Sequence, residues 1–323
     1  MTEKQMRVCR KGRPALFFLI LFLMILVLSG YFGKLAVTLD NTQALGRDSV
    51  RVQLQQQREN SIDVLVLGDS ESYTSFSPVQ FFQTTGSTAF VAGQSGQKTT
   101  EAVSLLLAAL DRQRPRAVIL ETNELFRYNN SWEAMRDKIY QGAGRLFPLF
   151  RYHNLWKACV EKKPKLVEES YFGFKIRKRV SAYRGAKDYM QATKKKAVIP
   201  ASIRQDLEQI RKECQNRGIP LILYSAPSPV NYSMARHNAI AELAEKENIT
   251  YLDLNLQTSE IGIDWNRDTL DGGDHLNYDG AVKTTDWLTK YLQKHITLEN
   301  HKDDPAYADW KKVTEEYVSM VSR

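Results

Sequence analysis

A short apolar run, Val64–Leu67, constrains this chain most, because Gly68, Asp69 and Ser70 follow it directly. Its apolar residues do not alternate with polar ones, which is typical of a strand covered on both faces in a parallel sheet. Gly68 permits a sharp turn. Ser70 then lies just past the carboxyl end of the strand, where ligands and reactive groups collect in open α/β sheets. The pattern predicts either a catalytic serine or a serine that caps the next helix.

Strand and helix patterns alternate along much of the remaining chain. We predict strands at residues 62–67, 89–92, 115–120, 219–224 and 249–254, and helices at residues 78–82, 99–110, 202–217, 234–246 and 278–294. Alternating units of this length predict an α/β domain with a doubly wound, mostly parallel sheet and helices on both faces.

The N-terminal region carries an uncharged, strongly apolar segment, residues 14–33, behind a basic stretch in residues 1–13. About twenty such residues are enough to cross the hydrocarbon core of a bilayer as a helix, and the basic residues favour a cytoplasmic N-terminus. We expect a cytoplasmic tail (1–13), a single transmembrane anchor (14–33) and a polar stalk (34–60). The alternative is a cleaved signal peptide with Val27 and Ser29 near the cleavage site, and both interpretations put the following domain outside the cytoplasm.

The alternation of strands and helices stops between residues 127 and 200, in a segment rich in aromatic and basic side chains. We predict a largely helical insertion there. It is either a lid or docking surface for an anionic partner, membrane or polymer, or a solvated basic elaboration with a small core of its own. The formal net charge of +8 fits attraction to an anionic surface or polymer, because no nucleic-acid-binding module accompanies it. No nucleic-acid partner is therefore expected.

The chain has three cysteines, which are too few for a disulfide scaffold. Cys159 and Cys214 would share an oxidising compartment, where they either pair or remain free thiols. No Cys-x-x-Cys motif or histidine-rich cluster suggests a structural metal. We expect no metal and no cofactor.

Three further segments could serve a reactive Ser70. The loop Gly93–Gly96 could bring a backbone N–H to an oxyanion, or its glycines serve only the turn. Asn123 follows the third predicted strand and is either an oxyanion donor or a turn residue. His275 stands in the loop Asp271–Asn277, where it is a general base steadied by a carboxylate, a metal ligand or part of a helix cap.

The order Gly68-Asp69-Ser70, then Gly93 and Gly96, then Asn123, then Asp271 with His275 resembles the SGNH (GDSL) hydrolase superfamily. The resemblance covers residues 61–126 and 200–295 and implies a flavodoxin-like three-layer α/β/α fold for a domain at 61–295, with the 127–200 insertion outside the resemblance. We expect a helical tail at 296–323. The resemblance also implies Ser70 as nucleophile and His275 as base. The oxyanion hole would consist of the backbone N–H groups of Ser70 and Gly96 and the side chain of Asn123.

The sequence departs from the family pattern in two places. The usual Gly-x-Asn-Asp block reads Glu121-Thr122-Asn123-Glu124, and the position three residues before His275 holds Gly272 instead of aspartate. Either Asp271 or Asp274 could therefore orient His275. We favour Asp271, because the side chains of adjacent residues in extended loops tend to point apart. Ser72 is a less favoured nucleophile than Ser70, because it lies further into the turn.

An N-terminal anchor, an extracytoplasmic SGNH domain and a large insertion resemble two types of bacterial envelope protein. These are the D-alanyl transfer protein of lipoteichoic acid synthesis and the alginate-type O-acetylation proteins. The resemblance implies a serine esterase or O-acyltransferase that acts on an envelope polysaccharide or teichoic-acid-like polymer beside a membrane-bound O-acyltransferase. The alternative is a non-catalytic assembly or binding partner of such an acyltransferase.

Overall fold

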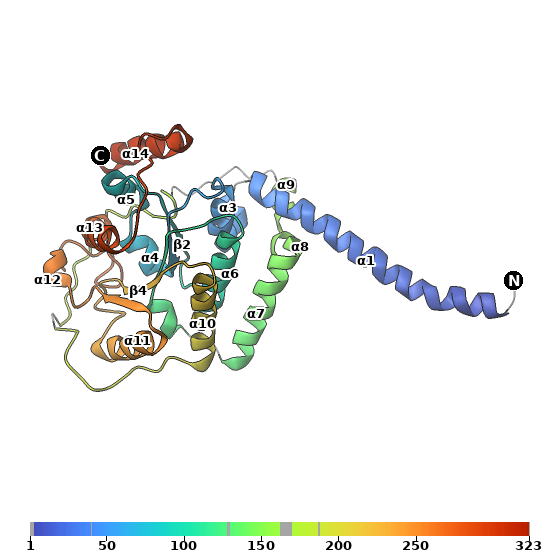
Figure 1. Cartoon of the computed structure of the whole chain (residues 1–323), viewed down its shortest axis with the longest axis horizontal. Coiled ribbons are helices and arrows are strands. Elements are labelled where there is room, and N and C mark those ends of the chain that lie inside the picture. The colour runs from blue at the N-terminus through green and yellow to red at the C-terminus, as the bar shows by residue number, and fades with distance from the viewer. Residues whose placement is uncertain (1–2, 40, 128–129, 162–169, 187, 323) are drawn as a thin grey trace.

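The structure is a computed structural model that describes residues 3–39, 41–127, 130–161, 170–186 and 188–322, with the side chains of residues 3–13 and 131 left aside (Figure 1). Residues 162–169 of the expected insertion therefore lie outside the described residues.

A five-stranded sheet forms the centre of the domain, with every neighbouring pair of strands parallel. Its strands are β1 (Val64–Gly68), β2 (Ala89–Gly93), β3 (Ala117–Glu121), β4 (Leu221–Ser225) and β5 (Thr250–Asp253). The order β2-β1-β3-β4-β5 reverses direction between β1 and β3, as in flavodoxin-like folds. The predicted doubly wound parallel sheet is thus confirmed.

Helices cover both faces of this sheet, because successive residues of a buried strand point to opposite sides. Leu65 and Leu67 of β1 belong to one core cluster, and Val64 and Val66 belong to the other. The first cluster is closed by α6 (Thr99–Leu110), α10 (Ala201–Gln215) and α11 (Met234–Glu247). The second is closed by α5 (Pro78–Thr85) and α13 (Tyr278–His295), and the short α4 (Ser70–Ser75) packs on β1 and β2.

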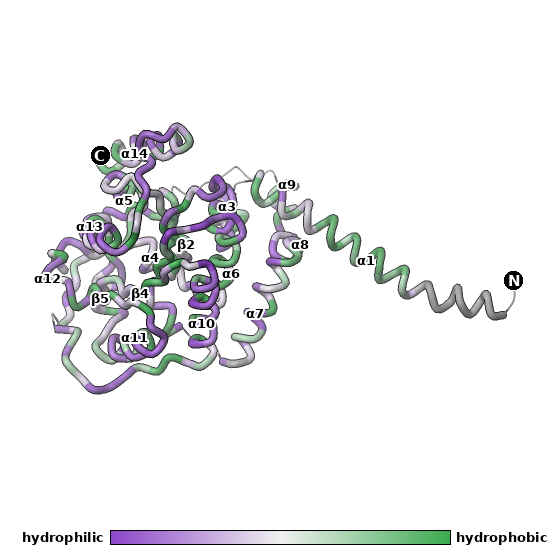
Figure 2. The backbone as a smooth tube through the Cα atoms, in the orientation of Figure 1, coloured by the Kyte–Doolittle hydropathy of each residue, from purple (hydrophilic) through white to green (hydrophobic). Residues whose placement is uncertain are grey.

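The N-terminal helix α1 (Glu3–Leu39) projects away from the domain (Figure 1). Its span Pro14–Leu39 has a mean hydropathy of 2.7 and is long and apolar enough to cross a membrane, a test that an N-terminal signal sequence also passes. Figure 2 shows this span as predominantly hydrophobic. Three short helices then follow and pack against the domain: α2 (Thr42–Leu45), the 3₁₀ helix η1 (Gly46–Asp48) and α3 (Ser49–Gln56).

The 127–200 segment is helical only in its first part, with α7 (Ser131–Leu146), α8 (Pro148–Tyr152) and α9 (Leu155–Val160). Its described residues from 170 to 200 contain an isolated bridge between Tyr171 and Phe174 and no helix. Aromatic packing holds this irregular part instead. Tyr171 and Phe174 are buried against Tyr317 of the C-terminal helix α14 (Ala308–Val321).

The two cysteines with described side chains are unpaired. Cys159 is exposed on α9, whereas Cys214 is buried in α10 within the core. The sequence leaves open whether these cysteines pair or remain free, and in the structure they are free thiols.

Candidate active site

The turn after β1 is built so that only glycine fits at its start. Gly68 has φ = +145°, and a Cβ atom there would lie 2.6 Å from the Cβ of Glu121 on β3. Asp69 then caps α4, because its Oδ1 accepts a hydrogen bond of 3.0 Å from the backbone N–H of Glu71. Ser70 is the first residue of α4, so its backbone N–H has no acceptor within the helix. The turn therefore presents Ser70 at the point where the strand order reverses.

The side chain of Ser70 is linked to His275 and Asp271. Ser70 Oγ lies 2.8 Å from His275 Nε2, and His275 Nδ1 lies 2.7 Å from Asp271 Oδ2. A carboxylate can only accept, so His275 donates from Nδ1 and keeps the Nε2 lone pair for the Ser70 hydroxyl proton. Asp274 lies further away, with its Oδ2 3.6 Å from Nδ1. The geometry is that of a nucleophile, a base and an orienting acid.

Two glycines allow the loop before α13 to bring Asp271 to His275. Gly272 and Gly273 have φ = +78° and +98°, values that most other residues rarely adopt. The loop closes on itself, because Asp271 Oδ1 accepts a 2.8 Å hydrogen bond from the backbone N–H of His275. Ser228, in the segment after β4, donates its hydroxyl to the backbone oxygens of Gly273 and Asp274, at 3.0 and 2.7 Å.

The three expected oxyanion donors differ in how far other hydrogen bonds already engage them. Ser70 N–H lies at the start of α4, and Gly96 has φ = +59° with open space where its Cβ would be. The amide of Asn123 is engaged elsewhere. Its Nδ2 donates to Asp69 Oδ2 at 2.9 Å, and its Oδ1 accepts from Arg236 at 2.9 Å. This leaves Asn123 one amide N–H for an oxyanion.

Asp69 is the centre of a buried polar network beside Ser70. Its Oδ2 also accepts a 2.6 Å hydrogen bond from Arg127 Nε, so an arginine and an amide share one carboxylate oxygen. Asp69 is fully buried, and a charged carboxylate is retained in such a place only when it is paired and hydrogen-bonded. The network thus fixes the position of Asn123.

Three fully buried glutamates surround this network: Glu71, Glu121 and Glu124. Burial, reinforced by neighbouring carboxylates, raises the pKa of Glu71 and of Glu124 well above the ordinary value. The same causes raise the pKa of Glu121 to about 8, although Tyr232 donates a hydrogen bond to it. Burial thus favours the protonated form of these carboxyl groups, which limits negative charge beside the position where an oxyanion would form.

The sequence reasoning missed Asn231 and Ser228, which hold the histidine loop from the segment after β4. Asn231 Nδ2 donates to Glu71 Oε1 at 2.5 Å and to Asp274 Oδ1 at 2.6 Å, and so ties the helix α4 to the loop of His275. Their position in the sequence could have indicated this role. Both residues follow the predicted strand at 219–224, and the carboxyl ends of parallel strands lie at the same edge of a sheet.

Among the described residues, one group of side chains could hold a metal ion, because its ligand atoms lie within 4.8 Å of one another: Glu71, Asp274 and His275. Both ring nitrogens of His275 already have partners, Ser70 and Asp271. The arrangement therefore favours proton transfer over metal coordination.

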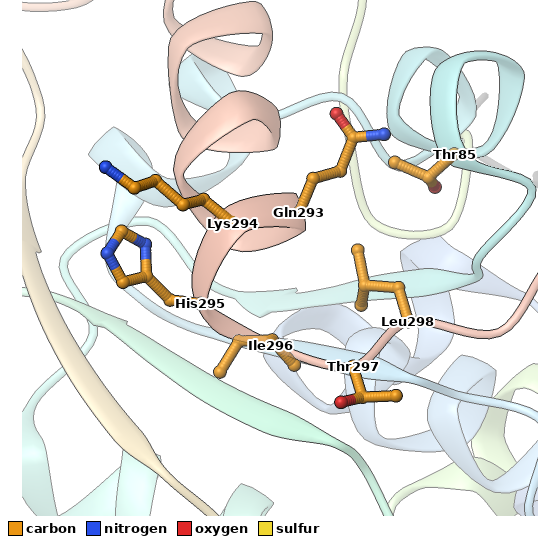
Figure 3. Close-up of a pocket in the computed structure, with 7 residues that line it drawn as sticks. All are labelled: Thr85, Gln293, Lys294, His295, Ile296, Thr297 and Leu298. Carbon is orange, nitrogen blue, oxygen red and sulfur yellow. The ribbon is translucent and has the colours of Figure 1, made fainter.

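Ser72 is turned away from this site. It is fully buried, its hydroxyl donates to the backbone oxygen of Asp69 at 2.7 Å, and a Cβ at Gly93 would lie 2.1 Å from its Oγ. A separate cavity of about 450 Å³ lies at the other end of α13, beside Lys294, His295 and Thr85 (Figure 3). It is lined by none of the residues linked to Ser70.

No family model matches the sequence, and neither does any curated protein. Solved structures to which the chain is similar include one described as a putative platelet activating factor from Streptococcus pneumonia, with 13% identity, 84% of this chain and 98% of that chain covered, and a TM-score of 0.42. The lipase/acylhydrolase from Enterococcus faecalis shows 12% identity, coverage of 74% and 99%, and a TM-score of 0.41. AlinE4, an SGNH-hydrolase family esterase, shows 17% identity, coverage of 74% and 98%, and a TM-score of 0.30. At such identities and TM-scores the chemistry of the site rests on its own geometry.

Proposed function

We propose that this protein is a serine ester hydrolase or O-acyltransferase of the SGNH type, which works through an acyl intermediate on Ser70. One observation carries the proposal: Ser70 Oγ, His275 and Asp271 are joined by hydrogen bonds of 2.8 and 2.7 Å at the edge of the sheet where its strand order reverses.

In the first half-reaction, His275 Nε2 removes the hydroxyl proton of Ser70 while Oγ attacks the ester carbonyl. Asp271 accepts from Nδ1–H, which fixes the tautomer and stabilises the imidazolium. The C–O bond of the ester then breaks, and the leaving alcohol takes the proton from His275. The acyl group remains on Ser70. The oxyanion would accept hydrogen bonds from the Ser70 N–H, the Gly96 N–H and the remaining N–H of Asn123.

In the second half-reaction, a water or an acceptor hydroxyl gives its proton to His275 and attacks the acyl carbonyl. Water completes hydrolysis, and a sugar or polyol hydroxyl completes transfer. The imidazolium then returns the proton to Ser70 Oγ as the C–O bond to the enzyme breaks.

Full-length protein in detergent tests this mechanism with p-nitrophenyl acetate and a fluorophosphonate probe. We expect Ser70→Ala and His275→Ala each to lower ester turnover by roughly a thousandfold or more, and Ser70→Ala to abolish labelling. Ser72→Ala is the matched control, since it removes a hydroxyl from the same turn and should keep both signals. Undiminished labelling of the Ser70→Ala protein would overturn the proposal.

We place the catalytic domain outside the cytoplasm, held by α1 as an uncleaved anchor. The basic residues in 1–13 support this side of the membrane, and one contact of α1 supports the uncleaved anchor. Ala36 is fully buried in a small cluster with Tyr152 and Leu155, but it follows the alternative cleavage site near Ser29 and would remain after cleavage. Nearer the N-terminus, and before that cleavage site, the ring of Phe22 lies 6.4 Å from that of Phe147, just before α8. This contact would be lost if the segment were removed as a signal peptide.

An anionic envelope polymer is the substrate class that we favour, either an envelope polysaccharide or a teichoic-acid-like polymer. Its support is the net charge of +8 and the basic insertion beside the membrane helix. Acyl analysis of the envelope from cells that carry Ser70→Ala separates the two reactions. A loss of esters means transfer, their accumulation means hydrolysis, and an unchanged envelope contradicts this substrate class.

The engagement of Asn123 with Asp69 and Arg236 favours a second candidate, a non-catalytic partner of a membrane-bound O-acyltransferase. Such a protein would keep the fold and lose turnover. Polymer or acyltransferase binding that is unchanged by Ser70→Ala, without ester hydrolysis by the wild type, would support this candidate over the enzyme.

A further inference from the structure

A cavity of about 290 Å³ lies between η1, α3, α6, α7 and α8, and three arginines line it: Arg47, Arg51 and Arg151. Of these elements, α3, α6, α7 and α8 lie together on the side of the domain from which α1 projects (Figure 1). Tyr140 and Gln141 of α7 complete much of the wall. The cavity is separate from the triad, since it is lined by neither Ser70 nor His275.

Two of the three arginines have a carboxylate partner. Arg47 makes a bidentate pair with Glu101, with its Nη2 2.8 and 2.7 Å from the two carboxylate oxygens. Arg151 Nη1 lies 2.7 Å from Asp48 Oδ1. Both Asp48 and Glu101 also line the cavity. The wall therefore holds three cations and two anions.

Arg51 is the arginine of this cavity that has no carboxylate partner. It is 5% exposed, and its hydrogen bonds go to the hydroxyl and the backbone oxygen of Ser104, at 2.7 and 3.3 Å. Both acceptors are neutral, and no carboxylate among the described residues is within ion-pair distance of Arg51. Its Nε, like the Nε of Arg151, is buried without a hydrogen-bond partner. A buried charge without a counter-ion is unfavourable, so the site is incomplete by one anion.

Arg51 nevertheless keeps its charge at neutral pH. Burial lowers its pKa to about 10, and the neighbouring guanidinium of Arg151 acts in the same direction. The carboxylate of Asp48 raises the pKa of Arg51, but it offsets these two effects only in part.

We propose that this cavity binds a phosphate group, presented by a phosphodiester polymer or by a phospholipid headgroup. Guanidinium groups from three separate helices, η1, α3 and α8, line the cavity, and a phosphate offers more oxygens to several such groups than a carboxylate does. The volume of about 290 Å³ leaves room for the polyol attached to such a phosphate. The proposal goes beyond the ester chemistry and does not depend on it.

The cavity connects the membrane helix to the loop of the catalytic edge. Arg47 follows closely on the end of α1 at Leu39, and α8 packs along α1, where Pro148 contacts Gly33. Arg47 Nη1 also donates a 2.6 Å hydrogen bond to the backbone oxygen of Ser95, beside Gly96. A phosphate held here would thus sit near the membrane boundary and against the loop expected to hold the oxyanion.

The test measures thermal stability and calorimetric binding of the full-length protein in detergent with inorganic phosphate and glycerol 3-phosphate. Both should raise the melting temperature, compared with chloride at equal ionic strength. Arg51→Gln removes the charge and can still hydrogen-bond to Ser104. It should weaken phosphate binding by about tenfold or more, without lowering the stability of the phosphate-free protein.

Gln141→Glu tests the proposal more directly, because it places in the cavity wall the carboxylate that the site lacks. Gln141 Oε1 already accepts a 2.7 Å hydrogen bond from Arg151, and glutamate has the same shape. This variant should be more stable than wild type without phosphate and should no longer respond to it. Lys312→Gln, on an exposed face of α14, is the control and should respond as the wild type does.

The source of the phosphate is decided by two further probes. Binding of a soluble poly(glycerol phosphate) identifies the polymer. A response confined to phosphatidylglycerol nanodiscs identifies the headgroup. The proposal is wrong if the wild type does not respond to any phosphate probe, if Gln141→Glu still responds, or if oligouronates bind in preference to phosphates. Ser70→Ala should bind phosphate normally, so a failure of the ester mechanism would be recognised separately.

Discussion

His275 has two carboxylates within reach in sequence, and at the scale of single residues geometry separates their roles. Asp271 lies 2.7 Å from Nδ1, whereas Asp274 Oδ1 accepts a hydrogen bond from Asn231 and its Oδ2 lies 3.6 Å from Nδ1. Asp271 is thus placed to orient the imidazole, and Asp274 is placed to hold the loop through Asn231.

This difference predicts unequal effects of two matched substitutions. Asp271→Asn should lower kcat for p-nitrophenyl acetate by roughly a thousandfold, because asparagine can donate to Nδ1 and favour the wrong tautomer. Asp274→Asn should lower it by less than about tenfold, because an amide oxygen still accepts from Asn231. Steady-state kinetics of the two proteins compare the roles. A larger loss for Asp274→Asn would assign the orienting role to Asp274.

At the scale of elements, the close contact between β1 and β3 depends on Gly68. A side chain there would meet the Cβ of Glu121 at 2.6 Å, and the φ of +145° is unfavourable for alanine. Gly68→Ala should therefore lower the free energy of unfolding by about 3 kcal/mol, measured by urea denaturation. Equal stability of Gly68→Ala and wild type would contradict this account of the turn.

Gly142 in α7 provides the control for this substitution. A Cβ atom there would meet nothing within 4 Å, and alanine favours helix over glycine. Gly142→Ala should raise stability by up to about 1 kcal/mol.

The helix α1 allows a second prediction at this scale, concerning the anchor. The protein should remain in the membrane fraction after an alkaline carbonate wash, with its original N-terminus intact. Leu23→Arg places a charge in the apolar span at a cost of about 3 kcal/mol and should reduce membrane insertion, whereas Leu23→Ile should not. A mature chain that begins after Ser29 would show that the span is a signal peptide.

At the scale of the whole molecule, a group of buried carboxylates makes stability depend on pH. The pKa of Glu121 is about 8 in the folded protein, compared with an ordinary value of 4.5. The folded state therefore binds this proton more tightly than the unfolded state does. The resulting stabilisation is complete below about pH 4.5 and is lost as the pH rises through about 8.

Glu121→Gln removes this titration while retaining a polar side chain of the same shape. Its melting temperature relative to wild type should increase steadily between about pH 5 and pH 8, as measured by calorimetry. Glu315→Gln, on the exposed surface of α14, is the control: the difference between its melting temperature and that of wild type should stay constant over this pH range. A constant difference between Glu121→Gln and wild type over this range would mean that Glu121 does not titrate there.

The sequence by itself determined the elements of this protein. Runs such as Val64–Leu67 have no polar alternation because both faces of the strand are covered, and that requirement is local enough to be seen in the chain. The same local character made the apolar span and the serine turn recognisable. The expectation of a largely helical insertion succeeded only for α7 to α9, because the residues from 170 onward are held by distant aromatic contacts.

Only the tertiary structure decided how the polar side chains pair. It brings Asp271 closer to His275 than Asp274, directs the amide of Asn123 to Asp69, and leaves Arg51 without a carboxylate. Each of these outcomes depends on hydrogen bonds of about 3 Å, whose geometry is set by the path of the loops. Most of them join residues far apart in the chain. Composition and residue spacing do not specify such distances, because these are established only when the sheet and its helices pack together.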